Sequence, residues 1–295
     1  MRILVLRGGA VGDFLVTLPM LGLLRARWPG AAIELVGNAR AGALGVRSGC
    51  LDAVHSQDQG RWGALAGDGP LPGELERWLA AFDLVINFWP DPDGALARRF
   101  PIHPGQRYLS GAAVPAVAPA ARHFCEVLRP LGLQTLDFRA RLPAPVVARS
   151  AIALHPGSGS PRKNWSIGRW RELAGRLAGP VLVVLGPAEL DRPEISAAFP
   201  ADSGRLVVSR ALPLAALADQ LAGCRAFVGH DSGLSHLAAA VGTPCVLLFG
   251  PSDPATWAPP GDHVQVVRQG PDLAAIGVAA VEAAVRRALA LTPAF

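Results

Sequence analysis

The sequence predicts an α/β protein of two doubly wound, Rossmann-like domains that face one cleft. Short apolar runs alternate with helix-like segments, an alternation typical of parallel sheets covered by helices. The alternation stops at Pro143 and Pro145 and then restarts. The length of 295 residues divides naturally by two at roughly 100 to 200 residues per domain, and a single barrel of this size is the alternative.

The first half opens with a strand, a turn and a helix. The apolar run at residues 3–6 predicts the strand, the glycines of residues 8–12 the turn, and the apolar pattern of residues 13–27 a helix that ends before Pro29. The next expected elements are a strand at 33–36, a helix at 39–46, a strand at 84–88 and a helix at 120–131. Residues 90–120, which contain many Pro, Gly and Arg residues, give the weakest pattern.

The second half repeats the alternation after residues 142–145, where two prolines disfavour both a helix and a central strand. We therefore expect an N-terminal domain over residues 1–145 and a C-terminal domain over residues 146–295. Strands are expected at 152–155, 181–185, 206–208, 226–228 and 245–249, and helices at 167–177, 214–221 and 234–241. A last helix, at 278–291, packs on either domain. Ligand-binding loops are expected at the carboxyl ends of the strands.

The composition excludes several classes of protein. With 51% hydrophobic and 17% charged residues, the chain is neither disordered nor fibrous. A net charge of +5 without a dense basic run fits a phosphorylated or acidic small ligand, and argues against a nucleic-acid partner. Lys163 is the only lysine among 28 basic residues, which indicates a site that needs a compact ammonium and not the planar fork of Arg.

Cysteine spacing and hydropathy predict the compartment. Cys50, Cys125, Cys224 and Cys245 lie far apart without zinc-site spacing, so we expect reduced, buried thiols and no metal. The N-terminal segment lacks the cleavage site of a signal peptide. The longest apolar stretch, residues 14–24, is too short to span a bilayer. The expected location is the cytoplasm, with peripheral contact at the inner membrane left open.

The first strand is followed by the glycine-containing segment Arg7-Gly-Gly-Ala-Val-Gly-Asp13. It matches neither G-x-G-x-x-G nor G-x-x-x-x-G-K-[ST], so it is neither a dinucleotide fingerprint nor a P-loop. Gly9 and Gly12 would let a substrate approach the backbone closely. Asp13, at or near the helix start, is either a simple N-cap or a catalytic carboxylate, and its spacing leaves both roles open.

A second strand-to-helix turn, residues 155–165, is a candidate anion site. Ser158 and neighbouring small residues precede Lys163. Backbone N–H groups, a helix dipole and the ammonium would together bind a phosphate. The alternative is an ordinary Gly/Ser loop with a solvated lysine.

A third turn, residues 229–236, offers the same physics. Asp231 and Ser232 could cap a predicted helix while exposed N–H groups face the cleft and form a second phosphate site. The alternative is capping alone, with His236 packed.

Two carboxylate segments remain. Glu189 follows the strand at 181–185, where a carboxylate binds ribose hydroxyls in other nucleotide folds. The alternative for Glu189 is an exposed residue at a helix start. Asp91-Pro92-Asp93 contains a D-x-D metal pattern, but Pro and Asp favour turns, so we expect a turn there.

At these residues the sequence resembles glycosyltransferase family 9, the bacterial ADP-heptose heptosyltransferases of lipopolysaccharide synthesis. In chain order, the segments that carry the resemblance are Gly12-Asp13, Thr17-Leu18-Pro19, His155-Pro-Gly-Ser158, Lys163-Asn-Trp165, Asp231-Ser-Gly-Leu-Ser-His236 and Phe249-Gly-Pro-Ser-Asp-Pro254. The resemblance implies the GT-B fold, with the acceptor on the first domain and the nucleotide sugar on the second.

The resemblance also implies residue roles. Asp13 matches the catalytic base, Lys163 the lysine on the donor phosphates, and Glu189 the ribose ligand. Gly9 and Gly12 would form the acceptor-side glycine loop, and Ser158 would lie on the donor side. The phosphate and sugar loop would comprise Asp231, Ser232, Gly233, Leu234 and His236; the family often has Thr where Ser232 stands.

The implied activity is metal-independent, inverting transfer of heptose from ADP-heptose, a substrate and not a cofactor, to an inner-core lipopolysaccharide acceptor. Five first-domain arginines would suit an anionic glycolipid acceptor or lie solvated on the surface: Arg61, Arg98, Arg99, Arg107 and Arg122. The first domain departs most from the family pattern, between residues 60 and 125. The alternatives are a GT-B transferase with another nucleotide sugar or acceptor, and an inactive nucleotide-sugar-binding protein.

Overall fold

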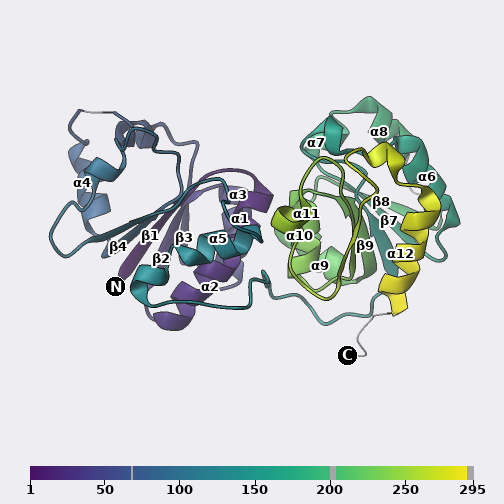
Figure 1. The fold of residues 1–295 in the computed structure, drawn as a ribbon, viewed down its shortest axis with the longest axis horizontal. Helices are drawn as coiled ribbons and strands as arrows, with labels where there is room; N and C mark the ends of the chain where they lie inside the picture. The colour runs from purple at the N-terminus through teal and green to yellow at the C-terminus, as the bar shows by residue number, and fades with distance from the viewer. Residues whose placement is uncertain (68, 200–203, 291–295) are drawn as a thin grey trace. The chain divides into compact units, whose positions relative to one another are not determined.

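The structure is a computed structural model that describes residues 1–67, 69–199 and 204–290 (Figure 1). The chain divides into two compact units, Met1–Phe138 and Arg139–Phe295. This division lies a few residues before the expected linker at 142–145. Each unit is a parallel sheet with helices on both faces, which confirms the doubly wound α/β class.

The first unit is built on a five-stranded sheet in the order β3-β2-β1-β4-β5, with every neighbouring pair parallel. The strands are β1 (Arg2–Arg7), β2 (Ala32–Gly37), β3 (Ala53–Ser56), β4 (Leu84–Asn87) and β5 (Arg107–Ser110). The helices are α1 (Val11–Leu15), α2 (Leu18–Arg27), α3 (Ala39–Arg47), α4 (Gly73–Ala80) and α5 (Ala120–Glu126). Residues 3–6 of the central strand β1 are apolar and buried because helices cover both faces of the strand: α4 on one, and α2, α3 and α5 on the other (Figure 1).

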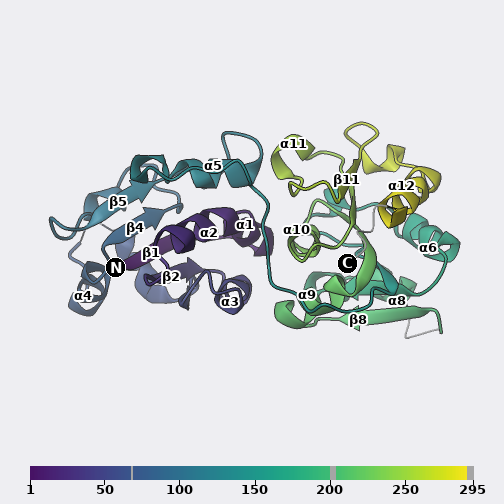
Figure 2. The ribbon, with the colours of Figure 1, turned by 90° about the horizontal axis from the view of Figure 1, so that it is seen from below.

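The second unit has a six-stranded sheet in the order β11-β10-β9-β6-β7-β8, again with parallel neighbours. The strands are β6 (Ala151–Leu154), β7 (Val181–Leu185), β8 (Leu206–Arg210), β9 (Cys224–His230), β10 (Cys245–Leu248) and β11 (Val264–Val267). The helices are α6 (Ile167–Arg176), α7 (Pro187–Leu190), α8 (Pro193–Ala198), α9 (Leu214–Ala222), α10 (Gly233–Ala240), α11 (Pro254–Trp257) and α12 (Val278–Ala290). Figure 2 shows α9 and α10 on the side of this sheet away from α6 and α12.

The order β9-β6-β7 determines where the candidate residues meet. The loops after these three neighbouring strands leave the same edge of the sheet because the strands are parallel. Short 3₁₀ turns complete the connections: η1 (Gly60–Leu65), η2 (Ala97–Arg99), η3 (Arg129–Leu131), η4 (Pro161–Lys163) and η5 (Leu273–Ala275).

The single helix expected at residues 13–27 is in fact two helices. α1 begins at Val11, before Asp13, and α2 begins at Leu18. The break falls at Thr17, whose hydroxyl donates to the Phe14 carbonyl over 2.6 Å. Pro19 then occupies the first turn of α2, where its missing N–H needs no partner. The helix expected at 120–131 ends at Glu126 and gives way to η3.

The last helix belongs to the second unit. α12 packs on α6 and on strands β9, β10 and β11. Val281, Ala284 and Val285 of this helix are buried in the core around the fully buried Trp170. Of the two placements that the sequence left open, the structure therefore shows the second. Leu291, the expected last residue of the helix, lies outside the described residues.

Candidate functional site

The glycine turn after β1 is shaped around the Asp13 side chain. Gly9 has a φ of +109°, a conformation that favours glycine, and a Cβ there would lie 2.5 Å from Asp13 Oδ2. The Gly9 N–H donates to Gln57 Oε1 over 3.1 Å, and Asn38 Nδ2 donates to the Gly9 carbonyl over 3.2 Å. Gly12 lies inside α1 and not in the turn, because the helix begins at Val11.

Asp13 both caps a helix and forms an ion pair. It is the third residue of α1 and not its N-cap, and its Oδ2 accepts the N–H of the N-cap residue Ala10 over 2.8 Å. Its Oδ1 accepts from Arg7 Nη2 over 3.0 Å. The Asp13 side chain remains 35% exposed and the Arg7 side chain only 5%. Asp13 is therefore anchored at both oxygens yet accessible to a substrate.

In the second unit, two predicted residues lie in direct contact. Lys163, at the end of η4, places Nζ 2.5 Å from Oδ2 of Asp231, which follows β9. The Lys163 side chain is 36% exposed and that of Asp231 is 10% exposed. The ammonium thus lies beside the start of α10, held by a carboxylate that a bound diphosphate could displace.

The turn before α10 corrects one expectation. Ser232 is the N-cap residue of α10, but its side chain makes no capping hydrogen bond. Its Oγ lies 3.3 Å from Ser235 Oγ and 3.5 Å from His155 Nδ1, while Asp231 pairs with Lys163. The prediction that these two side chains cap α10 is therefore wrong. Gly233 and Leu234 open the helix, where the first N–H groups have no carbonyl within the helix to bind. His236, at the end of this first turn, is buried.

Glu189 is buried, so the exposed alternative is wrong. It is 3% exposed, in the first turn of α7. Its Oε2 accepts the Gly186 N–H over 2.9 Å and lies 3.5 Å from His155 Nε2. Burial raises the pKa of Glu189, but the His155 contact and the N–H bond outweigh it, so the net pKa is lowered and the carboxylate is ionised. Gly157 allows the close approach, since a Cβ there would overlap the Glu189 carboxylate.

Two histidines that sequence reasoning did not single out hold these loops. His230, the last residue of β9, is fully buried, and burial lowers its pKa to about 3. Its Nε2 accepts the Trp165 N–H over 2.8 Å, so Nδ1 carries the proton and donates to the Gly157 carbonyl over 3.1 Å. His155, also buried, lies between Glu189 and Ser232. The sequence signal that could have identified both histidines was their position at the carboxyl ends of predicted strands, β6 and β9, which are neighbours in the sheet.

Ser158 stabilises the loop that carries Lys163. Its hydroxyl is buried, 2.8 Å from the Ser160 carbonyl and 2.6 Å from Asn164 Oδ1. The hydroxyl proton is therefore used inside the loop, and a role of Ser158 toward a donor stays a prediction.

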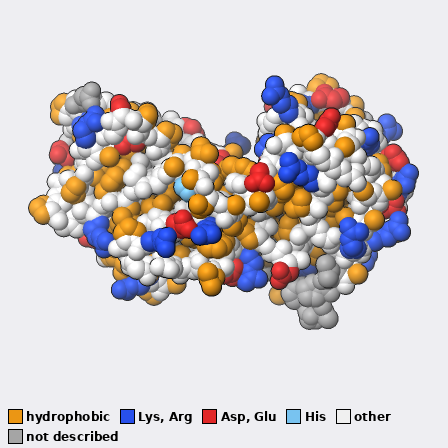
Figure 3. Space-filling view, in the orientation of Figure 1, with side chains coloured by type: hydrophobic (Ala, Val, Ile, Leu, Met, Phe, Trp, Pro, Cys, Tyr) orange, Lys and Arg blue, Asp and Glu red, His pale blue; other side chains and the backbone are white. Residues whose placement is uncertain are grey.

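The five arginines of the first unit contact groups of that unit. Arg61 lies 4.1 Å from the centre of the Trp62 ring, and Arg98 and Arg99 donate to the carbonyls of Asp93 and Gly69. Arg107 donates to the Pro130 carbonyl over 3.4 Å and Arg122 to Glu126 over 2.8 Å. On the face in Figure 3 the Lys and Arg side chains are spread out and form no single patch. Their role toward an acceptor stays a prediction.

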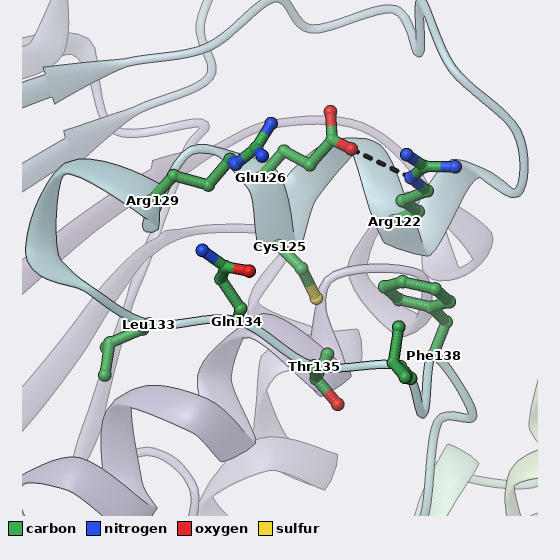
Figure 4. A pocket seen from close by; sticks show the side chains of 9 residues that line it. Arg122, Cys125, Glu126, Arg129, Leu133, Gln134, Thr135 and Phe138 are labelled. Atoms are coloured by element: carbon green, nitrogen blue, oxygen red, sulfur yellow. Dashed lines mark hydrogen bonds and ion pairs between the residues drawn. The ribbon is translucent and has the colours of Figure 1, made fainter.

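A pocket of about 240 Å³ in the first unit lies between α5 and the segment that follows it (Figure 4). Arg122 lines it, but its ion pair with Glu126 partly neutralises the charge that the pocket presents. Asp13, Gly9 and Gly12 do not line this pocket.

Several expectations about metals, thiols and membranes can be compared with the described residues. Asp91 and Asp93 form a turn, as predicted, in which their carboxylates accept the N–H groups of residues 95–97. The four cysteines are free, and burial raises the pKa of Cys125 and Cys224 to about 12. Among the described residues, His, Cys, Asp and Glu form no group of three that could hold a metal ion. No described helix is long and apolar enough to cross a membrane.

Comparison with known proteins establishes the family. The model of glycosyltransferase family 9 (heptosyltransferase) matches residues 128–276, half of the chain. The chain belongs to this family. The match covers the strands, loops and ion pair that form the second-unit site.

Individual relatives are consistent with this membership. Lipooligosaccharide heptosyltransferase 2 of Haemophilus influenzae is 32% identical over 178 residues, which cover 55% of this chain and 51% of that protein. The aligned part thus spans about half the length of this curated relative.

The structure of Escherichia coli ADP-heptose lps heptosyltransferase II has a TM-score of 0.79 at 21% identity, covering 98% of this chain and 99% of its own. Escherichia coli heptosyltransferase WaaC with ADP gives 0.73 at 22% identity, covering 98% and 100%. These two structures show that this family member has the GT-B fold of the heptosyltransferases.

Proposed function

We propose that this protein is an inverting, metal-independent glycosyltransferase that moves a heptose from ADP-heptose to an anionic glycolipid acceptor of the inner-core lipopolysaccharide type. The observation that carries the proposal is the Lys163–Asp231 pair beside the start of α10, on the same sheet edge as the ionised Glu189. Membership in family 9 supports the choice of sugar. The family member WaaC, solved with ADP and with ADP-2-deoxy-2-fluoro heptose, supports the choice of nucleotide.

In this proposal the donor diphosphate binds between Lys163 and α10. The ammonium would exchange Asp231 for a phosphate oxygen, and the N–H groups of Gly233 and Leu234 would bind the other oxygens. Ser232 and His236 lie at and within the same first turn, close to where the sugar would be attached. Glu189 would accept hydrogen bonds from ribose hydroxyls.

The reaction balances without a metal. Asp13 removes the proton from the acceptor hydroxyl, whose oxygen attacks the anomeric carbon of the heptose. The bond from that carbon to the diphosphate breaks with inversion, and ADP leaves with the electron pair. As the leaving diphosphate gains charge, Lys163 and the α10 dipole stabilise it more strongly than they stabilise the bound donor. Transfer requires that Asp13 and the donor on the second unit meet during the reaction.

An apolar loop supports a lipid-linked acceptor. Residues 111–119 contain only Gly, Ala, Val and Pro, and the Val114 side chain is 72% exposed. Exposed loops are usually polar, so an apolar one indicates a binding role. His123 holds the Ala112 carbonyl over 2.9 Å and Arg7 the Ala113 carbonyl over 3.3 Å. Because Arg7 bonds both the Ala113 carbonyl and Asp13, the loop lies near Asp13. An acceptor with a hydrocarbon part would need such an apolar surface near the base.

A donor panel assayed for nucleoside diphosphate release tests the proposal. We expect ADP release from ADP-heptose only when a Kdo-lipid A acceptor is present. Asp13→Ala should lower turnover by a factor of about 100 or more, following the size of general-base effects, while donor affinity stays unchanged. Release of nucleoside diphosphate from a different nucleotide sugar would show that the donor is not ADP-heptose. If the unmodified protein binds a donor but releases no nucleoside diphosphate, it is a nucleotide-sugar-binding protein and not an enzyme.

A further inference from the structure

We propose that Arg7 is the positioning residue of the Asp13 base: it fixes the orientation of the carboxylate. This inference rests on the proposed function, in which Asp13 accepts the proton of the acceptor hydroxyl. Arg7 is the last residue of β1 and Asp13 the third residue of α1. The strand, the glycine turn and the helix start therefore bring the two side chains together across six positions of the sequence.

The guanidinium of Arg7 is held on three sides. Its Nη2 donates to Asp13 Oδ1 over 3.0 Å, and its Nη1 donates to the Ala113 carbonyl over 3.3 Å. Its central carbon lies 4.5 Å from the centre of the Phe124 ring, a cation–π distance. A planar group with these contacts has little freedom to rotate, so it presents one N–H to Asp13 in a fixed direction.

The burial of Arg7 makes Asp13 its electrostatic partner. Arg7 is 5% exposed, and its Nε is buried without a hydrogen-bond partner in the described structure. Burial lowers the pKa of Arg7, and the charge of Asp13 together with their hydrogen bond opposes that effect. The Asp13 carboxylate is thus the opposite charge in direct contact with this buried guanidinium.

The second Asp13 oxygen completes the orientation. Oδ2 accepts the Ala10 N–H, and only a glycine at position 9 leaves room for it. Each carboxylate oxygen thus makes one hydrogen bond and keeps a lone pair, since an ionised carboxylate accepts about four bonds in all. A lone pair on a third-exposed, oriented carboxylate can accept the proton of a hydroxyl.

Other charges near Asp13 are more exposed. α3, which packs on α1, carries the exposed Arg40 and Arg47. α5, which provides Phe124, carries the exposed Arg122, paired with Glu126, and the half-exposed His123, which binds the loop carbonyl of Ala112. Solvent screens these groups more than it screens Arg7, so Arg7 is the cation that interacts most strongly with Asp13.

The test compares Arg7→Met, Arg7→Gln and Arg7→Lys in the full-length protein, with Arg25→Met as the matched control. Arg25 also pairs with an aspartate of the first unit, Asp52 at 2.5 Å, but lies outside the proposed site. For the two neutral variants we expect kcat to fall between about 10-fold and 100-fold, the cost of a misplaced catalytic group. The donor KM should change less than twofold. Arg7→Lys, which keeps the charge and a hydrogen-bond donor, should restore part of kcat.

Each outcome decides the matter. If the neutral variants keep the original kcat, the inference is overturned. A loss of kcat that Arg7→Lys does not relieve and that Arg25→Met shares assigns Arg7 a purely structural role and overturns the inference as well. If Arg7→Met does not fold, Arg7→Gln, which keeps hydrogen-bonding capacity without charge, gives the answer. If the unmodified protein releases no nucleoside diphosphate from any donor, the proposed function itself is wrong. That outcome is distinct from the two outcomes that overturn the role of Arg7.

Discussion

At the scale of single residues, the candidate site depends on charged groups that are held in pairs before any substrate binds. Lys163 is held by Asp231, Asp13 by Arg7, and Glu189 by His155 and the Gly186 N–H. Pairing reduces the entropy lost when a substrate is bound, because the long side chains are already ordered. The proposed reaction then exchanges one partner for another and does not have to immobilise free side chains.

Lys163 should not be replaceable by arginine. The Lys163→Arg variant keeps the charge, but its wider planar group cannot occupy the position from which Nζ now reaches Asp231 at 2.5 Å. We expect kcat/KM for the donor to fall about tenfold or more, and Lys163→Met to lose about 100-fold or more, as expected for a group that stabilises developing charge. Steady-state kinetics with the active donor measure both. Arg162→Met, which removes the exposed neighbouring cation in the same 3₁₀ turn, is the control and should stay within twofold. Equal losses at 162 and 163 would contradict a specific role of the ammonium.

At the scale of elements, His230 clamps the loop that carries Lys163 onto β9. It accepts the Trp165 N–H and donates to the Gly157 carbonyl, so it is bonded at both ends of the loop. Because the folded state lowers its pKa to about 3 from an ordinary value of 6.5, the unfolded chain binds a proton more readily. The stabilisation is complete above pH 6.5 and is lost as the pH falls from 6.5 toward 3.

This sign gives a measurable prediction. Between pH 6.5 and 4 the free energy of unfolding should fall with a contribution from His230 of up to about 1.4 kcal/mol per pH unit. His230→Gln should be less stable at pH 7 by about 1–3 kcal/mol, because a buried partner is lost, and should lack this part of the slope. Urea unfolding at several pH values measures both. The control is His263→Gln in the same unit, where the half-buried ring bonds the Ala239 carbonyl over 3.0 Å. A slope that His230→Gln leaves unchanged would be the contrary result.

Several of the elements that the sequence did not predict are too polar or too short to show a periodic pattern. β5 and β11 are edge strands whose side chains are mostly half-exposed or exposed, so they show no apolar run, whereas the buried β1 and β7 do. α7 and α11 have four residues each, too few for a helical period. The apolar pattern continued through residues 13–27 and concealed the break at Thr17, which depends on one hydroxyl and on Pro19.

For the candidate site, the sequence predicted where single residues lie but not which of them are in contact. Asp13, Lys163 and Asp231 follow buried strands, so their places at the carboxyl edges followed from the parallel sheets. The pairing of Lys163 with Asp231 depends on the strand order β9-β6-β7, which periodicity does not contain. The roles of His155 and His230 were missed for the same reason, since each contacts loops from a different strand.

At the scale of the whole molecule, the proposed roles are divided between the two compact units. The proposed base, Asp13, belongs to the first unit, and the proposed donor residues belong to the second.

If the donor residues act as proposed, ADP alone should bind the second unit. We expect slower amide hydrogen exchange in residues 155–165, 186–190 and 231–236, with protection of up to about 2.7 kcal/mol at an ADP concentration 100 times its Kd. Hydrogen exchange read by mass spectrometry, with and without ADP, measures this. Lys163→Met should reduce the protection in all three segments at the same ADP concentration, whereas Asp13→Ala should leave it intact because the proposal assigns Asp13 to the acceptor. Protection confined to residues 8–13 would place the nucleotide on the first unit and reverse the assignment of donor and acceptor.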